Sequence, residues 1–473
     1  MKRKLLNNAL NEIRDDQVAE AASARKKRPL LRISAIAAVL AAAILVSSIQ
    51  APEPAVPLAS AKGLLASPVY PQMAQYPIDN SNDMDAYSAH WESVRALHNQ
   101  PLDYATGTED FFQKSMVQFL SDDSSENQVY SPLNVYMALA MLAETTDGHS
   151  RKQILNLLGS KNIKSLRTQA EHMWKAHYWN DGLSTSILAN SLWLDSDYSY
   201  NPETVQTLAD QYYASVFSGD LGSDEMNKTL QSWLNEQTHG LLKEQANRES
   251  FDPRTTLALA STFYYKVQWG SKFNEEENTQ GIFHTPGADV DATYMNKTLF
   301  YGGYYWGDTF GAVCLNLEDG SNMWLVLPDQ GVSPKDVLHE DSLYAIMRQS
   351  YLYPDHKDVI VNLSVPKFDV VSKQSLVSGL KALGVTDVFQ EGVADFSPII
   401  PQQNGDYVSE ISHAARVGID EDGVIAAAYT VILAAGAGMP PEEEIDFVLD
   451  RPFLFVIADR DGIPLFSGVV NQP

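Results

Sequence analysis

Cysteine is almost absent from this chain, since Cys314 is the single one in 473 residues. One cysteine excludes an internal disulfide and any zinc site built on cysteine ligands. Basic residues are scarce after the N-terminus. Residues 1–32 hold nine Lys or Arg and four acids, a net +5, whereas the whole chain carries −26, which leaves −31 on the remainder. So acidic a body excludes nucleic acid as the expected partner, because neutralising phosphates needs a basic surface.

Catalytic signatures are missing as well. The sequence contains no G-x-S-x-G turn, no phosphate-binding P-loop, no H-E-x-x-H and no dinucleotide-binding glycine pattern. His172 and His177 are five residues apart on an expected helix, a spacing that does not place both on one face. We therefore predict no catalytic residue, no metal and no cofactor, and we do not expect an enzyme.

A single stretch is long and apolar enough to enter a membrane. Residues 31–49 are uncharged and mostly apolar after Arg32, and the basic run at 25–28 lies just before them. This flank predicts that the N-terminus stays cytoplasmic and that the following chain is exported. We expect a basic cytoplasmic segment at 1–30 and a membrane anchor at 31–49. The small residues at 58–61 leave a cleaved signal as the alternative.

The chain between the apolar stretch and the folded domain is rich in proline. Seven prolines occur from residue 51 to residue 101, which predicts a partly stiff tether. We therefore assign residues 50–100 to a proline-containing linker and residues 101–473 to the folded domain. Thr108 is expected to cap the first helix of that domain.

Periodicity predicts a mixture of helices and strands. Helical patterns cover 132–144, 149–158, 203–213, 225–236 and 373–383. Strand-like runs cover 186–194, 256–267, 310–318, 323–328, 359–364 and 446–458. Helices concentrated early and strands later, without a repeating βαβ order, predict an α+β fold with much antiparallel sheet.

The stretch EDGVIAAAYTVILAAGAGMPPEEE at 421–444 combines two patterns that conflict. Residues 424–437 are uncharged, and in an extended conformation both faces would be apolar, as in a strand at the middle of a covered sheet. Gly436, Gly438 and Pro440-Pro441 are instead typical of an exposed, cleavable loop. A segment with two states, loop outside and strand inside, satisfies both patterns. A strand or helix that stays buried is the alternative.

Seven further motifs follow one another in a recognisable order. They are NQVYSPLNVYMALAMLA (127–143), ILANSLWL (187–194), TFYYKVQWGSKF (262–273), VPKFDV (365–370), LGVTDVF (383–389), DRPFLFVI (450–457) and PLFSGVVNQP (464–473). Together they resemble the serpin family over about 350 residues. Any one motif alone would be weak evidence, but seven in family order are strong evidence.

The resemblance implies a serpin fold of α+β class. We expect a large mixed or antiparallel central sheet, smaller sheets, about eight or nine helices and an exposed reactive-centre loop at 421–441. The implied function is suicide inhibition: a serine protease cleaves the loop, forms a covalent acyl complex, and the freed segment inserts as a new strand. A non-inhibitory serpin that acts as a binding or structural domain, and a membrane-tethered hydrolase, are the alternatives.

The resemblance also assigns residues to roles. The hinge from which the loop folds in matches Glu421, Gly423, Val424, Ala426, Ala427 and Ala428, and the reactive bond is expected at Ala437–Gly438, with Met439 as the rival position. Glu421 and Lys367 match an ion pair of the family. Ser131, Asn134, Ser261 and His413 match the polar cluster beneath the sheet, called the shutter, although Ser261 replaces the usual Asn. Trp269 matches the top of the sheet, called the breach.

The expected partner follows from the reactive bond. A small residue before that bond favours an elastase-like or subtilisin-like protease, with cysteine proteases as a secondary target class. The resemblance and the N-terminal segment together predict a monomeric bacterial protein that acts outside the cytoplasm. We expect it to contact the membrane only through the N-terminal helix, or to be released if that helix is cleaved.

Overall fold

The computed structural model describes residues 63–77, 83–121, 125–402, 405–424 and 441–473. The predicted membrane anchor at 31–49 lies outside these residues. Within the described ranges, no helix is long and apolar enough to cross a bilayer.

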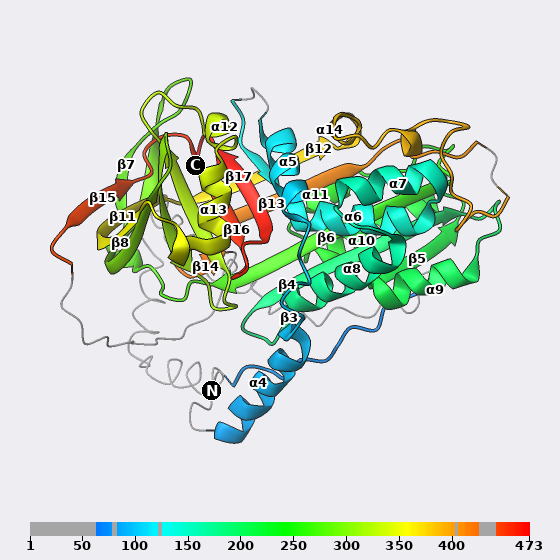
Figure 1. Ribbon diagram of the computed structural model, residues 1–473, viewed down its shortest axis with the longest axis horizontal. Coiled ribbons are helices and arrows are strands. Elements are labelled where there is room, and N and C mark those ends of the chain that lie inside the picture. The colour runs from blue at the N-terminus through cyan, green and yellow to red at the C-terminus, as the bar shows by residue number, and fades with distance from the viewer. Residues whose placement is uncertain (1–62, 78–82, 122–124, 403–404, 425–440) are drawn as a thin grey trace, which may run out of the picture. The chain divides into compact units, whose positions relative to one another are not determined.

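An eight-stranded sheet lies at the centre of the structure (Figure 1). Its strands, in spatial order, are β1 (Leu64–Ala66), β5 (Ala214–Gly219), β4 (Thr185–Asp195), β6 (Leu257–Gln268), β14 (Gly423–Val424), β13 (Ser412–Ile419) and β12 (Phe368–Ser375), with β3 (Trp179–Asn180) paired to β4. Strands β4 and β5 are parallel, and the other neighbours are antiparallel. The predicted large mixed sheet is confirmed.

A second sheet has nine strands. They are β15 (Glu444–Val448), β11 (His356–Pro366), β8 (Asp289–Trp306), β9 (Phe310–Asn316), β10 (Asn322–Pro328), β16 (Phe453–Ala458), β17 (Pro464–Val470) and β2 (Gln128–Tyr130), with β7 (Thr279–His284) paired to β8. Strand β8 has 18 residues and pairs with β7, β11 and β9. We expected separate smaller sheets, but β8 is long enough to pair with strands on both sides and joins them into one sheet.

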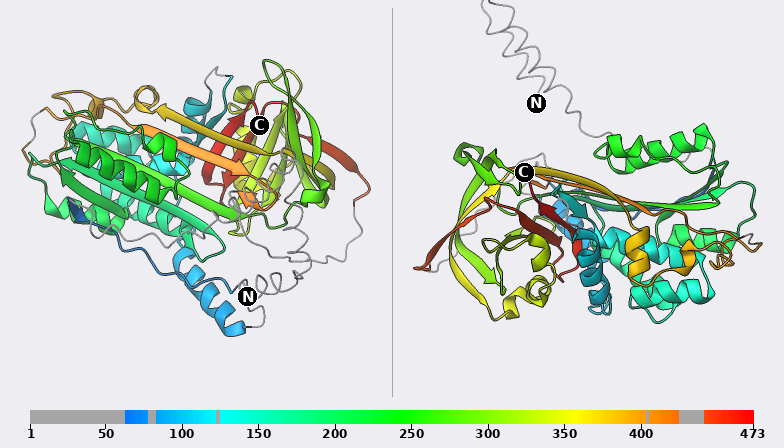
Figure 2. Two further views of the ribbon diagram at one scale, coloured as in Figure 1. Left: turned by 180° about the vertical axis from the view of Figure 1, so that it is seen from behind. Right: turned by 90° about the horizontal axis from the view of Figure 1, so that it is seen from above.

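Eleven α-helices occur in the described residues. They are α4 (Met84–His98), α5 (Glu109–Leu120), α6 (Pro132–Thr145), α7 (Gly148–Leu157), α8 (Ile163–His177), α9 (Pro202–Gln211), α10 (Asp224–Gln237), α11 (Lys243–Ala246), α12 (Pro334–Val337), α13 (Asp341–Gln349) and α14 (Val377–Ala382). The number exceeds the expected eight or nine, since α11 and α12 are four-residue turns. In the right-hand view of Figure 2, α10 covers one face of the central sheet, while α6 and α8 lie on the other.

Helix α6 is buried almost all round. Every residue except Ala138 is buried, and the helix packs against both β6 and β17. A helix that is apolar on all sides needs such a position between two layers. Pro132 occupies the first turn, where its missing N–H costs nothing. Helix α6 thereby places its polar N-terminal residues, Ser131 and Asn134, beneath the central sheet.

Most predicted elements are confirmed, and two needed correction. The helices predicted at 132–144, 149–158, 203–213 and 225–236 correspond to α6, α7, α9 and α10. The helix predicted at 373–383 is wrong at its start, because residues 373–375 complete β12. The strand predicted at 446–458 is two strands, β15 and β16, and the buried Leu449 between them hid the break in the pattern.

Part of the stretch expected to be a linker is folded onto the domain. Strand β1 extends the edge of the central sheet by pairing with β5. The ring of Tyr70 stacks on Trp174, with 5.4 Å between ring centroids. His90 on α4 lies with its Nε2 2.9 Å from Oδ2 of Asp181, and both side chains are almost fully buried. The proline content led us to expect a linker, but residues between the prolines pack against apolar side chains of the domain.

The packing of this stretch can be tested at Tyr70. Substitution by alanine should lower the free energy of unfolding by about 2 kcal/mol, because the ring stack is lost and a cavity remains. Val69→Ala is the matched control, since Val69 is 88% exposed and should change stability by less than about 0.5 kcal/mol. Urea denaturation followed by tryptophan fluorescence measures both. Equal effects of the two substitutions would contradict the observed packing.

Candidate functional site

The central sheet is interrupted between β6 and β13. On its outer side, β6 pairs with β4 over ten residues, Leu257 to Lys266, and β13 pairs with β12 over eight. On the sides that face each other, the described residues contribute only one short connection, β14, at one end. The facing edges therefore present backbone N–H and C=O groups that a further strand could pair with.

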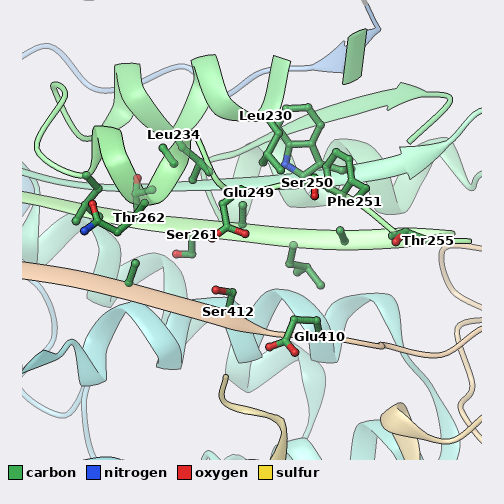
Figure 3. Close-up of a pocket in the computed structure, with 18 of the residues that line it drawn as sticks. Leu230, Leu234, Glu249, Ser250, Phe251, Thr255, Ser261, Thr262, Glu410 and Ser412 are labelled. Atoms are coloured by element: carbon green, nitrogen blue, oxygen red, sulfur yellow. The ribbon is translucent and has the colours of Figure 1, made fainter. Parts of the chain in front are cut away.

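A cavity of about 280 Å³ follows this interruption (Figure 3). We call the whole interruption, from this cavity to the short strand β14, the β6–β13 groove; the cavity itself reaches no further along β6 than Thr262. One wall includes Ser261 and Thr262 of β6, and the other includes Ser412 of β13. Leu230 and Leu234 of α10 cover its outer side. The side chains of Ser261 and Ser412 on its two walls are small, whereas Glu249 and Glu410 add carboxylates to the lining.

Two hinge residues fill the head of the groove. Gly423 lies opposite Gln268, and Val424 lies between Val267 and Ile419. A Cβ atom on Gly423 would be 2.4 Å from the carbonyl oxygen of Val267. Gly423 does not adopt a positive φ. Glycine is therefore required here for close approach to the backbone of β6.

Glu421 connects the hinge to the opposite strand. Its carboxylate forms an ion pair with Lys367 and accepts a hydrogen bond from Nδ2 of Asn278. Burial by itself would raise the pKa of the Glu421 carboxylate. The hydrogen bonds from Lys367 and Asn278 outweigh burial, so the pKa of Glu421 lies below its ordinary value. Because Lys367 is 34% exposed, such a pair contributes no more than about 1 kcal/mol. Its effect is mainly to fix the position of the hinge beside β12.

Trp269 fixes the other side of the hinge. The residue is 2% exposed and follows directly after β6. Its backbone N–H donates to the carbonyl oxygen of Asp422 at 3.0 Å, and its indole N–H donates to the carbonyl oxygen of Asp420 at 2.8 Å. The predicted breach residue thus binds the hinge backbone directly.

The four predicted shutter residues lie together beneath the middle of the groove. The backbone N–H of Ser131 donates to Nε2 of His413 at 3.1 Å, and its hydroxyl donates to the carbonyl oxygen of Leu465 at 2.7 Å. Ser261 contacts Asn134 through its hydroxyl. Since Nε2 of His413 accepts a hydrogen bond, the ring is neutral, and burial lowers the pKa of His413 to about 4.

Asn190 is a further member of this cluster that the sequence did not indicate. It lies on β4 opposite Ser261, whose hydroxyl is 2.7 Å from Oδ1 of Asn190. Its Nδ2 donates to the carbonyl oxygen of Tyr212 at 2.9 Å. A side-chain amide from the neighbouring strand thus lies where Ser261 departs from the family pattern. No sequence spacing could reveal it, because strand pairing brings together residues 71 positions apart.

Some predicted residues cannot be placed. Ala426, Ala427, Ala428 and the predicted reactive bond at Ala437–Gly438 lie outside the described residues. Among the residues that are described, no group of three His, Cys, Asp or Glu side chains is arranged to hold a metal ion.

The protonation of His413 predicts a dependence of stability on pH. Its pKa is about 4 in the folded protein and near 6.5 when unfolded, so the unfolded chain binds the proton more readily. Stability should be complete above about pH 6.5 and fall by up to about 3 kcal/mol as the pH drops towards 4. The midpoint of urea unfolding, measured from pH 7.5 to 4.5, tests this. His413→Gln should flatten the dependence and His172→Gln should not; an unchanged profile for His413→Gln would refute the assignment.

The close approach of Gly423 predicts a local effect of adding one methyl group. Gly423→Ala should separate β14 from β6, because its Cβ would meet backbone atoms that cannot move independently. Hydrogen–deuterium exchange of the peptide that contains Val267 and Gln268 should become faster. Gly418→Ala is the control, since a Cβ there would have only ordinary contacts at 3.4 Å or more. Equal exchange in both variants would show that Gly423 does not require this approach.

Comparisons with known proteins agree with this arrangement. The family described as Serpin (serine protease inhibitor) matches residues 107–473. Serpin-ZX of Arabidopsis thaliana is 29% identical and aligns with 76% of this chain and 95% of its own length. Leukocyte elastase inhibitor of Homo sapiens is 28% identical, with 75% and 95% covered. These plant and human relatives do not support the bacterial origin that we expected.

Solved structures show the same fold. The native state of the thermophilic serpin tengpin has a TM-score of 0.70 at 24% identity and covers 79% of this chain and 95% of its own. The latent state of tengpin has a TM-score of 0.65, with 79% and 98% covered. The family match spans well over half of the sequence, so this chain belongs to the serpin family.

Proposed function

We propose that this protein is a suicide inhibitor of elastase-like or subtilisin-like serine proteases. The observation that carries the proposal is the β6–β13 groove with the hinge already paired at its head. The protease would cleave the reactive-centre loop and remain attached as an acyl complex, while the freed segment enters the groove as a new strand.

The hinge defines the register that an inserted strand would have. Gly423 pairs with Gln268 and Val424 with Val267, so an extended ladder places residues 425–434 opposite residues 266–257. These ten positions are the length over which β6 pairs with β4 on its other side. The predicted reactive bond at 437–438 follows three residues later. The available strand edge and the loop length therefore agree.

The side chains of the loop also fit this register. Val424 faces the core and is 1% exposed, so alternation would turn Ala426, Ala428 and Thr430 to the same face. Continuing the pairing with β6 places Thr430 opposite Ser261, and continuing the pairing with β13 places it opposite His413. The single hydroxyl on the inward face of the loop would thus meet the polar cluster beneath the groove.

Insertion would be favourable for two reasons. Each new backbone hydrogen bond contributes about 1 kcal/mol net, and a strand between β6 and β13 would form them on both sides. The apolar loop would also leave water for the covered groove. A charged side chain would reverse the second gain, because burying an unpaired charge is costly.

We base the proposed cellular location of the inhibitor on its N-terminal sequence. Residues 31–49 would hold the protein at a membrane, with the inhibitory domain outside the cytoplasm, or would be removed as a signal. We propose that it acts as a monomer towards one protease at a time. Ala437 before the reactive bond favours proteases with a shallow specificity pocket over those that require Arg or Lys.

Inhibition can be tested with the full-length protein and a panel of elastase-like and subtilisin-like proteases. Denaturing gels should show a covalent complex together with a released peptide that begins at Gly438. N-terminal sequencing of the released peptide identifies the reactive bond. If every protease of the panel leaves only nicked protein and stays active, the proposed mechanism fails.

A substitution at the hinge separates insertion from cleavage. Val424→Arg should leave loop cleavage intact but convert the inhibitor into a substrate, because the inward position at Val424 is buried. Glu442→Arg, at an exposed position beyond the loop, is the matched control and should retain complex formation. An undiminished yield of complex for Val424→Arg would contradict insertion in this register.

A further inference from the structure

The chain reverses direction just before the hinge in a turn closed by one carboxylate. Oδ1 of Asp420 accepts the backbone N–H groups of Asp422 at 2.9 Å and Gly423 at 3.1 Å. The N–H of Asp420 in turn donates to the carbonyl oxygen of Gly423 at 3.1 Å. Asp420 therefore fixes the turn between β13 and β14 from both its side chain and its backbone.

The same turn is held by the segment that follows β6. Phe273 N–H donates to the carbonyl oxygen of Glu421 at 3.0 Å. The ammonium group of Lys272, which is 17% exposed, lies 2.7 Å from Oδ1 of Asp422. With the two bonds from Trp269, these contacts tie the turn to the β6 wall, while Ile419 ties it to the β13 wall. The turn is the only described connection between the two walls at this end.

We infer that Asp420 is a positioning residue for loop insertion: its carboxylate holds, before cleavage, the turn from which the new strand grows. This inference rests on the proposed inhibitory function and adds a residue to it. The register of β14 is the one that an inserted strand would keep, so the turn needs no rearrangement after cleavage. Closing a hairpin turn is the entropically costly first step of strand pairing, and here it precedes the reaction.

A turn formed before cleavage should change how often the protease is trapped, and not how fast the loop is cleaved. In the proposed mechanism, insertion competes with hydrolysis of the acyl bond that joins protease and loop. A loop that starts from a formed turn inserts sooner, so less inhibitor is lost as cleaved product. Asp420 should therefore affect the number of inhibitor molecules consumed per protease, and not the rate at which the loop is cleaved.

Two substitutions of Asp420 show whether its hydrogen bonds to the turn or its negative charge matters for insertion. Both bonds to the carboxylate run from a backbone N–H to one oxygen, and asparagine offers an equivalent oxygen without charge. Burial raises the pKa of Asp420, which agrees with a role as hydrogen-bond acceptor more than as a charge. Asp420→Asn should therefore preserve the turn, whereas Asp420→Ala should lose it. Asp355→Ala removes an exposed carboxylate elsewhere and serves as the control.

The experiment uses full-length protein and a protease that the wild type traps. Asp420→Ala should slow insertion on the order of tenfold, the effect of about 1.4 kcal/mol on a barrier, and raise the stoichiometry of inhibition at an unchanged rate of loop cleavage. Asp420→Asn and Asp355→Ala should behave like wild type. An unchanged stoichiometry for Asp420→Ala, or equal defects for the alanine and asparagine variants, would overturn the inference.

A second measurement keeps this test separate from the proposed function. The loop can be nicked by any protease, and insertion is then followed as the rise in thermal stability over time. If no protease is trapped but the nicked wild type stabilises faster than nicked Asp420→Ala, the inhibitory function fails and the role of Asp420 stands. If the nicked wild type never stabilises, both fail. Should Asp420→Ala not fold, Asp420→Glu displaces the acceptor oxygen by one methylene and should slow insertion in the same assay; an unchanged rate would overturn the inference.

Discussion

The structure depends on two parallel strand edges in the middle of a sheet that, among the described residues, are paired only at one end. Strands β6 and β13 are each antiparallel to β14 and therefore run in the same direction. An antiparallel strand that continues β14 would pair with the backbone groups of both edges. The fold accommodates the interruption by covering one side with α10 and by placing the buried α6 on the other (Figure 2). The close approach at Gly423 and the apolar loop sequence both follow from this unfilled position.

The polar cluster beneath the groove is a second consequence of the interruption. Buried polar groups must be hydrogen-bonded, and here the partners come from four elements, α6, β4, β6 and β13. Ser131 and Asn134 belong to the start of α6, Ser261 to β6 and His413 to β13, while Asn190 reaches in from β4. The cluster links the two walls at a point where no strand of the described residues does. It is thus sensitive to their separation and to the protonation of His413.

What could be predicted from the sequence was carried by short continuous motifs. The order of seven motifs led to the fold, and the register of the hinge brought Lys367, Glu421 and Trp269 to the positions that the structure shows. Three features could not be predicted from the sequence, because each depends on tertiary structure. Asn190 joins the cluster only through strand pairing, the need for glycine at 423 depends on the backbone of β6, and the packing of Tyr70 depends on a tertiary partner. Each is a contact between residues distant in sequence, which no local pattern encodes.

Chain length explains why cleavage would be needed before the groove is filled. Ten residues inserted beyond Val424 would carry the chain about 33 Å along β6, away from the head of the groove. The loop must also reach Glu444, which pairs with β11 at the edge of the other sheet, and β15 lies beyond the head of the groove in Figures 1 and 2. Ten residue steps join residue 434 to Glu444 and span at most about 36 Å, which leaves almost nothing for the further distance from the head of the groove to β15. An intact loop therefore cannot fill the groove while β15 stays paired, whereas a cut near Ala437 removes this constraint and leaves the insertion edge complete.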